Sequence, residues 1–221
     1  MVTIRENTEG EYSGLEHEVV PGIVENLKII TKKASENVIR YAFEFAKKNN
    51  RKSITCCHKA GVMKLADGCF LDTFREISKE YRDIQALEKQ VDTTCIKLAK
   101  NPQDIDVMVM PNLYGDIISD LCAGLIGGLG LTASGNIGAN CAVYEAVHGT
   151  APDIAGQGVA NPTALLLSAC MMLHDMGFNQ EASMVENAVK DVFGEAKWLT
   201  RDLGGRATTN DFVSAILDNL K

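Results

Sequence analysis

The chain has 221 residues, of which 46% are hydrophobic and 23% charged, and its formal net charge is −7. This length allows one or two domains with a buried core, and the composition excludes disordered, collagen-like and disulfide-framework proteins. The acidic balance argues against non-specific nucleic-acid binding, which requires a basic face. The longest apolar runs, Leu121–Leu131 and Ala164–Leu173, are too short to span a bilayer.

The cysteines number seven, an odd count, and no two of them form a C-x-x-C pair. None of the four histidines stands at zinc-ligand spacing from a cysteine pair. The pattern therefore predicts reduced thiols in a reducing compartment and no zinc site.

Strand-like and helix-like segments alternate along the chain. In order, strands are predicted at Val2–Ile4, Leu27–Ile30, Ser53–Cys57, Asp106–Met110 and Cys141–Val147. Helices are predicted from an N-cap at Ser35 to Lys48, and over Asp67–Lys79, Gly115–Leu125, Pro162–Met176, Gln180–Phe193 and Thr209–Leu220. Loops are expected over Arg5–Gly14 and His148–Gly158, and Gln90–Cys95 fits neither pattern. The alternation indicates an α/β protein.

Two acidic residues follow the clearest strand, at the start of a predicted helix. Asp116 and Asp120 are four residues apart, so their carboxylates share one helix face. Such a pair is half of a Mg²⁺ or Mn²⁺ site. An Asp in a first helical turn also complements the helix dipole, and for this spacing alone that explanation is favoured.

A second candidate is the loop that begins at His148 and contains several small residues. Gly149 and Ala151 allow a phosphate or sugar to approach the backbone, and Asp153 offers an acceptor for a ribose diol. No G-x-G-x-x-G motif is present, so an ordinary Rossmann turn is not supported. An ordinary connecting loop with a surface histidine explains the spacing equally well.

Two further segments carry groups suited to acid–base or anion chemistry. Lys59 follows a strand end, where a lysine serves as an acid–base group or as a solvated surface amine. Arg5 offers a bidentate clamp for a carboxylate and Tyr12 a transferable proton, although a charged turn with a half-buried tyrosine accounts for the same residues.

Together and in this order, four motifs closely resemble the β-decarboxylating dehydrogenases, which comprise the isocitrate, isopropylmalate and homoisocitrate dehydrogenases. The greatest likeness is to the mitochondrial NAD-dependent isocitrate dehydrogenase branch. The motifs are Arg5-Glu6-Asn7-Thr8-Glu9-Gly10-Glu11-Tyr12, His58-Lys59-Ala60, Asn112-Leu113-Tyr114-Gly115-Asp116-Ile117-Ile118-Ser119-Asp120, and His148-Gly149-Thr150-Ala151-Pro152-Asp153-Ile154-Ala155-Gly156 with Ala160-Asn161-Pro162-Thr163.

The resemblance implies a role for each matching residue. Arg5 would bind a substrate carboxylate, Tyr12 would act as general acid at the carbon that loses CO₂, and Lys59 would help to remove the C2 hydroxyl proton. Mg²⁺ or Mn²⁺ would be held by Asp116 and Asp120, with Asp92 and Lys59 contributed by a neighbouring subunit. NAD would lie on a loop made by the following residues: His148, Gly149, Thr150, Ala151, Asp153 and Asn161.

The family fold is α/β, with a large domain, a small domain and a clasp. Applied to this chain, it assigns residues 1–8 and 52–126 to the small domain, 9–51 to the clasp and a connecting helix, and 127–221 to the large, cofactor-binding domain. The family's earlier segment, with further substrate arginines, has no counterpart here. We therefore expect the fold to be incomplete at its N-terminus, and the isolated polypeptide to have little activity.

The expected function is oxidation and decarboxylation of isocitrate to 2-oxoglutarate by a catalytic-type subunit in the mitochondrial matrix, within a homo- or hetero-oligomer. Two alternatives stay open: a non-catalytic regulatory or structural subunit, and a 3-isopropylmalate or homoisocitrate dehydrogenase. Gly61 departs from the family pattern, which often has Asn at that position. A nicotinamide or substrate contact is therefore in doubt.

Overall fold

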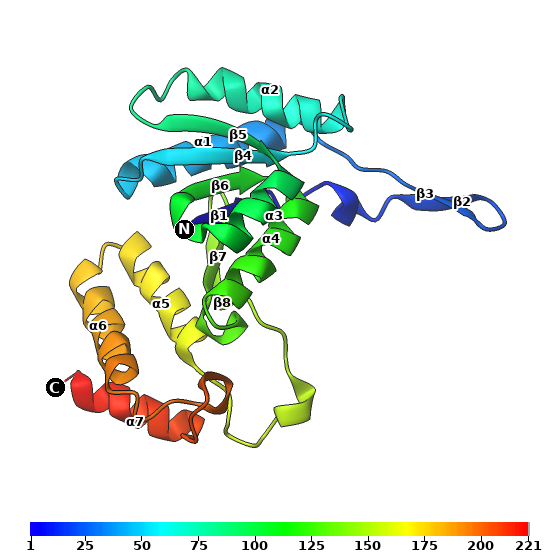
Figure 1. Ribbon diagram of the computed structural model, residues 1–221. Coiled ribbons are helices and arrows are strands. Elements are labelled where there is room, and N and C mark those ends of the chain that lie inside the picture. Colours follow the sequence, from blue (N-terminus) through cyan, green and yellow to red (C-terminus); the bar gives the residue numbers. More distant parts are fainter. Residues whose placement is uncertain (221) are drawn as a thin grey trace. The chain divides into compact units, whose positions relative to one another are not determined.

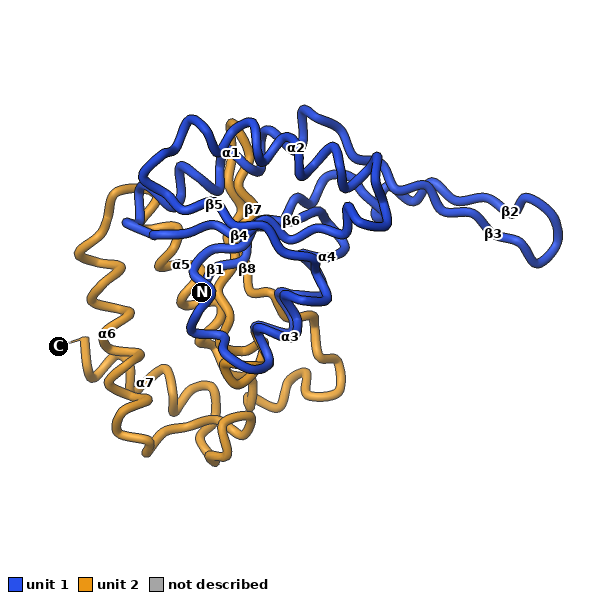
Figure 2. The backbone as a smooth tube through the Cα atoms, turned by 45° about the horizontal axis from the view of Figure 1, so that its top comes forward, with its two compact units in different colours: residues 1–122 blue, residues 123–221 orange. Residues whose placement is uncertain are grey.

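The computed structural model describes residues 1–220, which divide into two compact units. The first unit comprises Met1–Cys122, and the second comprises the rest of the chain (Figure 2). Within residues 1–220, no helix is long and apolar enough to cross a membrane.

The first unit is built on a four-stranded sheet in which every neighbouring pair of strands is parallel. The order is β1 (Val2–Arg5), β6 (Val107–Met110), β4 (Ser53–His58) and β5 (Gln85–Gln90). Four helices accompany the strands: α1 (Lys32–Lys48), α2 (Ala66–Ser78), α3 (Val91–Lys100) and α4 (Asn112–Leu125), the last of which runs past the unit boundary. The predicted α/β class is thus confirmed.

Helices cover both faces of this sheet, as Figure 1 shows. Val107 and Val109 of β6 pack into a core with α1 and α2, whereas Met108 and Met110 of the same strand pack with α3 and α4. Successive strand residues point to opposite faces, so a strand that is covered on both sides must be apolar throughout. This is why β6 is the strand that the sequence marks most clearly.

The segment after Gly14 differs from prediction. The structure has a hairpin of β2 (Glu16–Val20) and β3 (Ile23–Asn26), whose nine residues are all exposed (Figure 1). Gly22 takes φ +84° in its turn, a conformation that suits glycine. The predicted strand Leu27–Ile30 is wrong: Ile29 makes a single bridge to Gly10, because no neighbouring strand continues the ladder.

Two helix boundaries and one strand also differ from prediction. Helix α1 is capped by Thr31, whose hydroxyl accepts from the N–H of Ala34 at 3.1 Å, and not by Ser35, which is buried inside the helix. Helix α4 begins at Asn112, three residues before the predicted Gly115. Strand β5 escaped prediction because its residues are mostly polar and exposed.

The second unit combines a β-hairpin with three helices. Its elements are β7 (Ala133–Ile137), β8 (Ala142–Ala146), α5 (Thr163–Asp175), α6 (Asn179–Glu195) and α7 (Thr209–Asn219). Helix α5 packs on both strands, and Val192 of α6 meets Phe212 of α7 in a small core. Strand β7 was not predicted, because it lies in a glycine-rich stretch. The predicted loop 148–158 contains one 3₁₀ turn, Pro152–Ile154.

Candidate functional site

Functional groups gather where the parallel strands of the first unit end. Arg5 closes β1, Lys59 follows β4, and Asn112 follows β6 after one proline. Asp92 stands in the first turn of α3, directly after β5. In open parallel sheets, ligands bind beyond the carboxyl ends of the strands, so this edge is the place to look for chemistry.

The Arg5 side chain is held by two residues of α4. Its Nε and Nη2 donate to Asn112 Oδ1 at 2.9 and 2.7 Å, and Nη1 donates to Asp116 Oδ1 at 2.6 Å. The Arg5 side chain is 29% exposed, so the guanidinium stays reachable from solvent. Asn112 in turn donates to the Glu9 carbonyl at 2.7 Å, which ties the Arg5–Tyr12 loop to the helix.

Tyr12 completes this cluster from the loop that follows β1. Its hydroxyl donates to Asp116 Oδ2 at 2.7 Å, and its ring centroid lies 5.1 Å from the Arg5 guanidinium carbon. The hydrogen bond to Asp116 raises the pKa of Tyr12 above 10.0, because it stabilises the protonated phenol. At neutral pH, Tyr12 therefore carries a proton that it can donate.

Gly115 makes this packing possible. A Cβ at position 115 would lie 2.4 Å from Arg5 Cγ and 2.6 Å from Arg5 Cβ. The aliphatic part of the Arg5 side chain occupies that space, so Arg5 packs directly against the backbone of the first turn of α4.

Lys59 and Asp92 form a second pair on the same sheet edge. Lys59 Nζ lies 2.7 Å from Asp92 Oδ2, and this contact lowers the pKa of Asp92 below 3.8. Asp120 is exposed on α4, one turn after Asp116. Within residues 1–220, no three His, Cys, Asp or Glu side chains come together as a metal site, so Asp92 does not join the two α4 aspartates.

The neighbours of Lys59 shape its loop. His58 is buried, and its Nδ1 accepts from the N–H of Ala60 at 3.1 Å. Burial lowers the pKa of His58 below 6.5, so its role is that of a neutral acceptor. A Cβ on Gly61 would meet the Gln90 side chain at 3.5 Å, so a larger residue there would contact Gln90.

The second unit contains a hollow of about 780 Å³ at the loop after β8. Drug-sized ligands and cofactor fragments occupy pockets of roughly 300–1,000 Å³. The backbone is accessible here: Ala151 has φ +41°, and a Cβ on Gly149 would meet no atom within 4 Å. Asn161 is fixed by a bond to Asp202 Oδ2 at 2.9 Å and by the N–H of Thr163 at 3.0 Å. Small residues with a few polar groups suit part of a dinucleotide.

Most of the residues expected to bind cofactor line this hollow, namely His148, Gly149, Thr150, Ala151 and Asn161. Asp153 is exposed and does not line it. Arg201 and Asp202 do line it, although sequence reasoning did not select them. They lie 40 and 41 residues after Asn161, and no local sequence motif marks them, so only the folded structure shows that they line the hollow.

The sequence of the chain matches a known protein family. The isocitrate/isopropylmalate dehydrogenase family matches residues 1–216. The chain belongs to this family. A Drosophila melanogaster relative, named a probable mitochondrial NAD isocitrate dehydrogenase subunit alpha, is 56% identical over 220 residues, which cover 100% of this chain and 58% of the relative.

Two other members extend the comparison. Mitochondrial NAD isocitrate dehydrogenase subunit 2 of Schizosaccharomyces pombe is 55% identical over 225 residues, covering 100% of this chain and 59% of the relative. The crystal structure of isocitrate dehydrogenase from Methylococcus capsulatus superposes with a TM-score of 0.94 at 45% identity, covering 99% of this chain and 66% of that one. The chain thus spans about three-fifths of the length of the curated relatives named here.

Proposed function

We propose that this chain is a catalytic-type subunit for the NAD-dependent oxidative decarboxylation of isocitrate to 2-oxoglutarate and CO₂. The observation that carries the proposal is the contact of Arg5 and Tyr12 with opposite oxygens of Asp116. It joins a carboxylate-binding cation, a protonated phenol and a potential metal ligand in one cluster. The α-subunit name of the Drosophila relative supports the same reading.

The residues present suit a hard divalent cation. Asp116 and Asp120 offer oxygen donors one helical turn apart, and Asp116 is held in orientation by Arg5 and Tyr12. Mg²⁺ and Mn²⁺ prefer such oxygens and accept water and substrate as further ligands. Because Asp92 does not join these two residues within one chain, we assign it to the site of a second subunit.

When bound, the cation would supply Lewis-acid polarisation of the substrate oxygen, and NAD in the second-unit hollow would supply the hydride acceptor. The chain's own residues would bind the substrate and move protons. Arg5 would pair with a substrate carboxylate. Lys59 would help to remove the proton of the C2 hydroxyl, and Tyr12 would protonate the carbon from which CO₂ departs.

The choice of NAD over NADP rests on the relatives' names and on local charge. A 2′-phosphate at the hollow would approach the carboxylate of Asp202, and Asp153 adds a second negative charge on the adjoining loop. We propose that like-charge contact disfavours NADP by several-fold or more. Replacing Asp202 by Asn should reduce the preference for NAD, as measured by the ratio of kcat/KM values, and Asp153→Asn should have a smaller effect because Asp153 does not line the hollow.

Assembly and location are part of the proposal. The hairpin β2–β3 is exposed on all its residues, among them Val20, Ile23 and Val24, and an isolated two-stranded hairpin is marginally stable in water. We propose that it serves as the clasp to a homologous subunit. The relatives named above are mitochondrial, which favours the mitochondrial matrix for this chain.

Two alternatives remain distinct. A regulatory subunit would not need its metal carboxylates, and the presence of Asp92, Asp116 and Asp120 favours the catalytic type. The family also includes isopropylmalate dehydrogenases, so 3-isopropylmalate is the competing substrate.

The proposal is tested on the assembly that an affinity-tagged chain forms in its own cells. We expect NADH and CO₂ in equal amounts from isocitrate with Mn²⁺, and a loss of at least 100-fold in kcat for Asp116→Asn. Asp104→Asn is the control, because Asp104 is an exposed acid 3.9 Å from Lys97. Full activity of the Asp116→Asn assembly would indicate that this chain is a regulatory subunit. Turnover of 3-isopropylmalate in place of isocitrate would identify the chain as part of an isopropylmalate dehydrogenase.

A further inference from the structure

Asp67 is the most deeply buried carboxylate of the first unit, with no exposed surface. It stands in the first turn of α2, where an aspartate usually complements the helix dipole from an exposed position. Here the N-cap position is occupied by Leu65, whose side chain has no hydrogen-bond acceptor. Its Oδ2 accepts instead from the N–H of Lys59, eight residues earlier, at 2.6 Å.

This hydrogen bond gives the Lys59 N–H an acceptor that the sheet does not provide. The ladder between β4 and β5 ends at the pair His58–Gln90, so the N–H of Lys59 lies beyond the sheet. A buried N–H without a partner is costly. The Lys59 carbonyl is also held, since it accepts from the N–H groups of Val62 and Met63 at 2.9 and 3.0 Å. Both polar groups of the Lys59 backbone are therefore fixed.

A counter-charge accompanies the buried carboxylate. Lys28 Nζ forms an ion pair with Asp67 Oδ1 at 2.7 Å. The Lys28 side chain is 11% exposed, and its ammonium lies 4.4 Å from the Tyr114 ring centroid and 3.4 Å from Glu11 Oε1. Burial raises the pKa of Tyr114, so this phenol stays neutral. Lys28 is shared between two carboxylates, so neutralising Asp67 alone leaves it paired with Glu11, whereas neutralising Lys28 alone leaves both acids without this counter-charge.

We propose that Asp67 is a positioning residue for Lys59: its buried carboxylate, balanced by Lys28, fixes the backbone from which the Lys59 side chain reaches Asp92. The inference rests on the proposed function only for the role of Lys59 as proton acceptor. The bond is charge-assisted, and such bonds are shorter and stronger than neutral ones.

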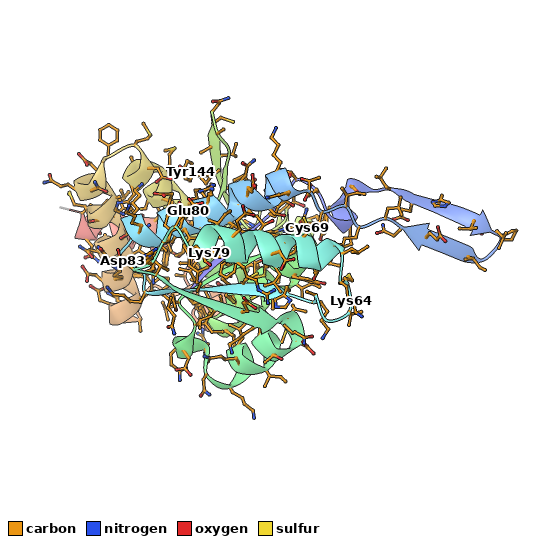
Figure 3. The ribbon with its side chains drawn as sticks, turned by 90° about the horizontal axis from the view of Figure 1, so that it is seen from above. Lys64, Cys69, Lys79, Glu80, Asp83 and Tyr144 are labelled. Carbon is orange, nitrogen blue, oxygen red and sulfur yellow. The ribbon has the colours of Figure 1, made fainter. Side chains whose placement is uncertain are left out.

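The same pair joins Lys59 to the root of the hairpin. Lys28 follows β3 by two residues, and Asp67 lies just beyond the loop that carries Lys59. Figure 3 shows this loop, marked by Lys64, on the side of the first unit from which β2 and β3 project. A displacement of the hairpin root would therefore alter the charge balance of the carboxylate that holds Lys59.

The test compares Asp67→Asn with Asp72→Asn in the tagged assembly. Asp72 lies on the same helix, but its side chain is 75% exposed and pairs with Arg75, so its substitution should change nothing at Lys59. The first readout is hydrogen exchange of the Lys59 amide, resolved to that residue, which does not depend on activity. We expect exchange at least tenfold faster in Asp67→Asn and unchanged in Asp72→Asn.

The second readout separates positioning from binding. We expect kcat to fall by about 10–100-fold with KM for isocitrate changed less than threefold, the scale on which a misplaced catalytic group acts. If Asp67→Asn fails to fold, its combination with Lys28→Met and Glu11→Gln removes all three charges of the cluster. This triple variant should fold but should restore neither the protection of the Lys59 amide nor kcat.

Unchanged exchange at the Lys59 amide in a folded Asp67 variant overturns the proposal, whether or not the assembly is active. Faster exchange with unaltered kcat overturns it as well, because the backbone bond would then have no bearing on the reaction. If the wild-type assembly does not oxidise isocitrate, the proposed function fails, while the exchange arm still decides whether Asp67 holds Lys59.

Discussion

Helix α4 contains two glycines for which the same substitution should have opposite effects on stability. Gly115 lies under the Arg5 side chain, whereas a Cβ on Gly124 would meet no atom within 4 Å. Replacing a helical glycine by alanine stabilises by about 0.5–1 kcal/mol when nothing else changes, because the unfolded chain loses freedom. Gly124→Ala should show this gain.

At Gly115, an added Cβ would clash with the Arg5 side chain. Contacts of 3.4 Å or more are ordinary for a Cβ, and here it would lie 2.4 Å from Arg5 Cγ and 2.6 Å from Arg5 Cβ. The shortfalls are therefore 1.0 and 0.8 Å. Rotation of the arginine relieves the first but not the second, since Arg5 Cβ is fixed by the pairing of β1 with β6. An alanine at position 115 therefore requires either strand β1 or helix α4 to shift.

Overpacking of this kind costs about 1–3 kcal/mol. After the helix-propensity gain, we expect Gly115→Ala to lose about 0.5–2 kcal/mol of unfolding free energy. Urea denaturation, monitored by far-UV circular dichroism, gives the free energy of unfolding of the Gly115→Ala and Gly124→Ala variants. Hydrogen exchange of residues 112–125 shows whether the stability changes within α4. Equal stabilisation by both substitutions would refute the view that Gly115 seats Arg5.

Other parts of the chain yield three further predictions. Asp116→Asn should lower the pKa of Tyr12 toward 10.0, since the hydrogen bond to the Asp116 carboxylate is the chief cause of its rise. Absorbance titration, with Tyr12→Phe as the reference, measures the Tyr12 pKa, and an unchanged value would contradict the prediction. The Asp211 carboxylate accepts a hydrogen bond from the N–H of Thr208, which lowers the pKa of Asp211 in the folded protein. Its contribution to the free energy of unfolding is therefore full above about pH 4 and is lost as the pH falls through the pKa of the folded state. Asp211→Asn should make the free energy of unfolding less dependent on pH in the acid range. Among the seven cysteines, all within the described residues, Cys141 alone is exposed and should react first with a thiol reagent, whereas burial raises the pKa of Cys57 to about 12 and keeps it inert until unfolding.

The sequence predicted those parts of the fold whose local pattern is strong. Strand β6 and helices α5, α6 and α7 lie close to their predicted bounds, because continuous apolar runs or a clear helical period mark them. The hairpin β2–β3 was missed since its residues are exposed on both faces, so no hydrophobic alternation records it. Ser35 was mistaken for a cap because a serine on a buried helix face resembles one in sequence.

The site was predicted where motifs are contiguous and missed where the fold assembles it. Arg5, Tyr12 and Asp116 were selected, but the contacts of Arg5 and Tyr12 with Asp116 span more than 100 residues of sequence and need the parallel pairing of β1 with β6. Asp67 gave no signal, because an acidic residue near a helix start is common. Its function depends on a turn back to Lys59 that only the structure displays.

In the proposed function, the Arg5–Tyr12–Asp116 cluster of one chain and the Lys59–Asp92 pair of a second copy serve the same reaction. Each of Lys59→Ala and Asp116→Asn should abolish isocitrate-dependent NADH formation when it is the sole form in the tagged assembly. Co-expressed and isolated as a mixed pair, the two variants should recover about half of the wild-type rate, since one of the two sites then has every group intact. A stable mixed pair without activity would show that the two groups do not combine across subunits in one site.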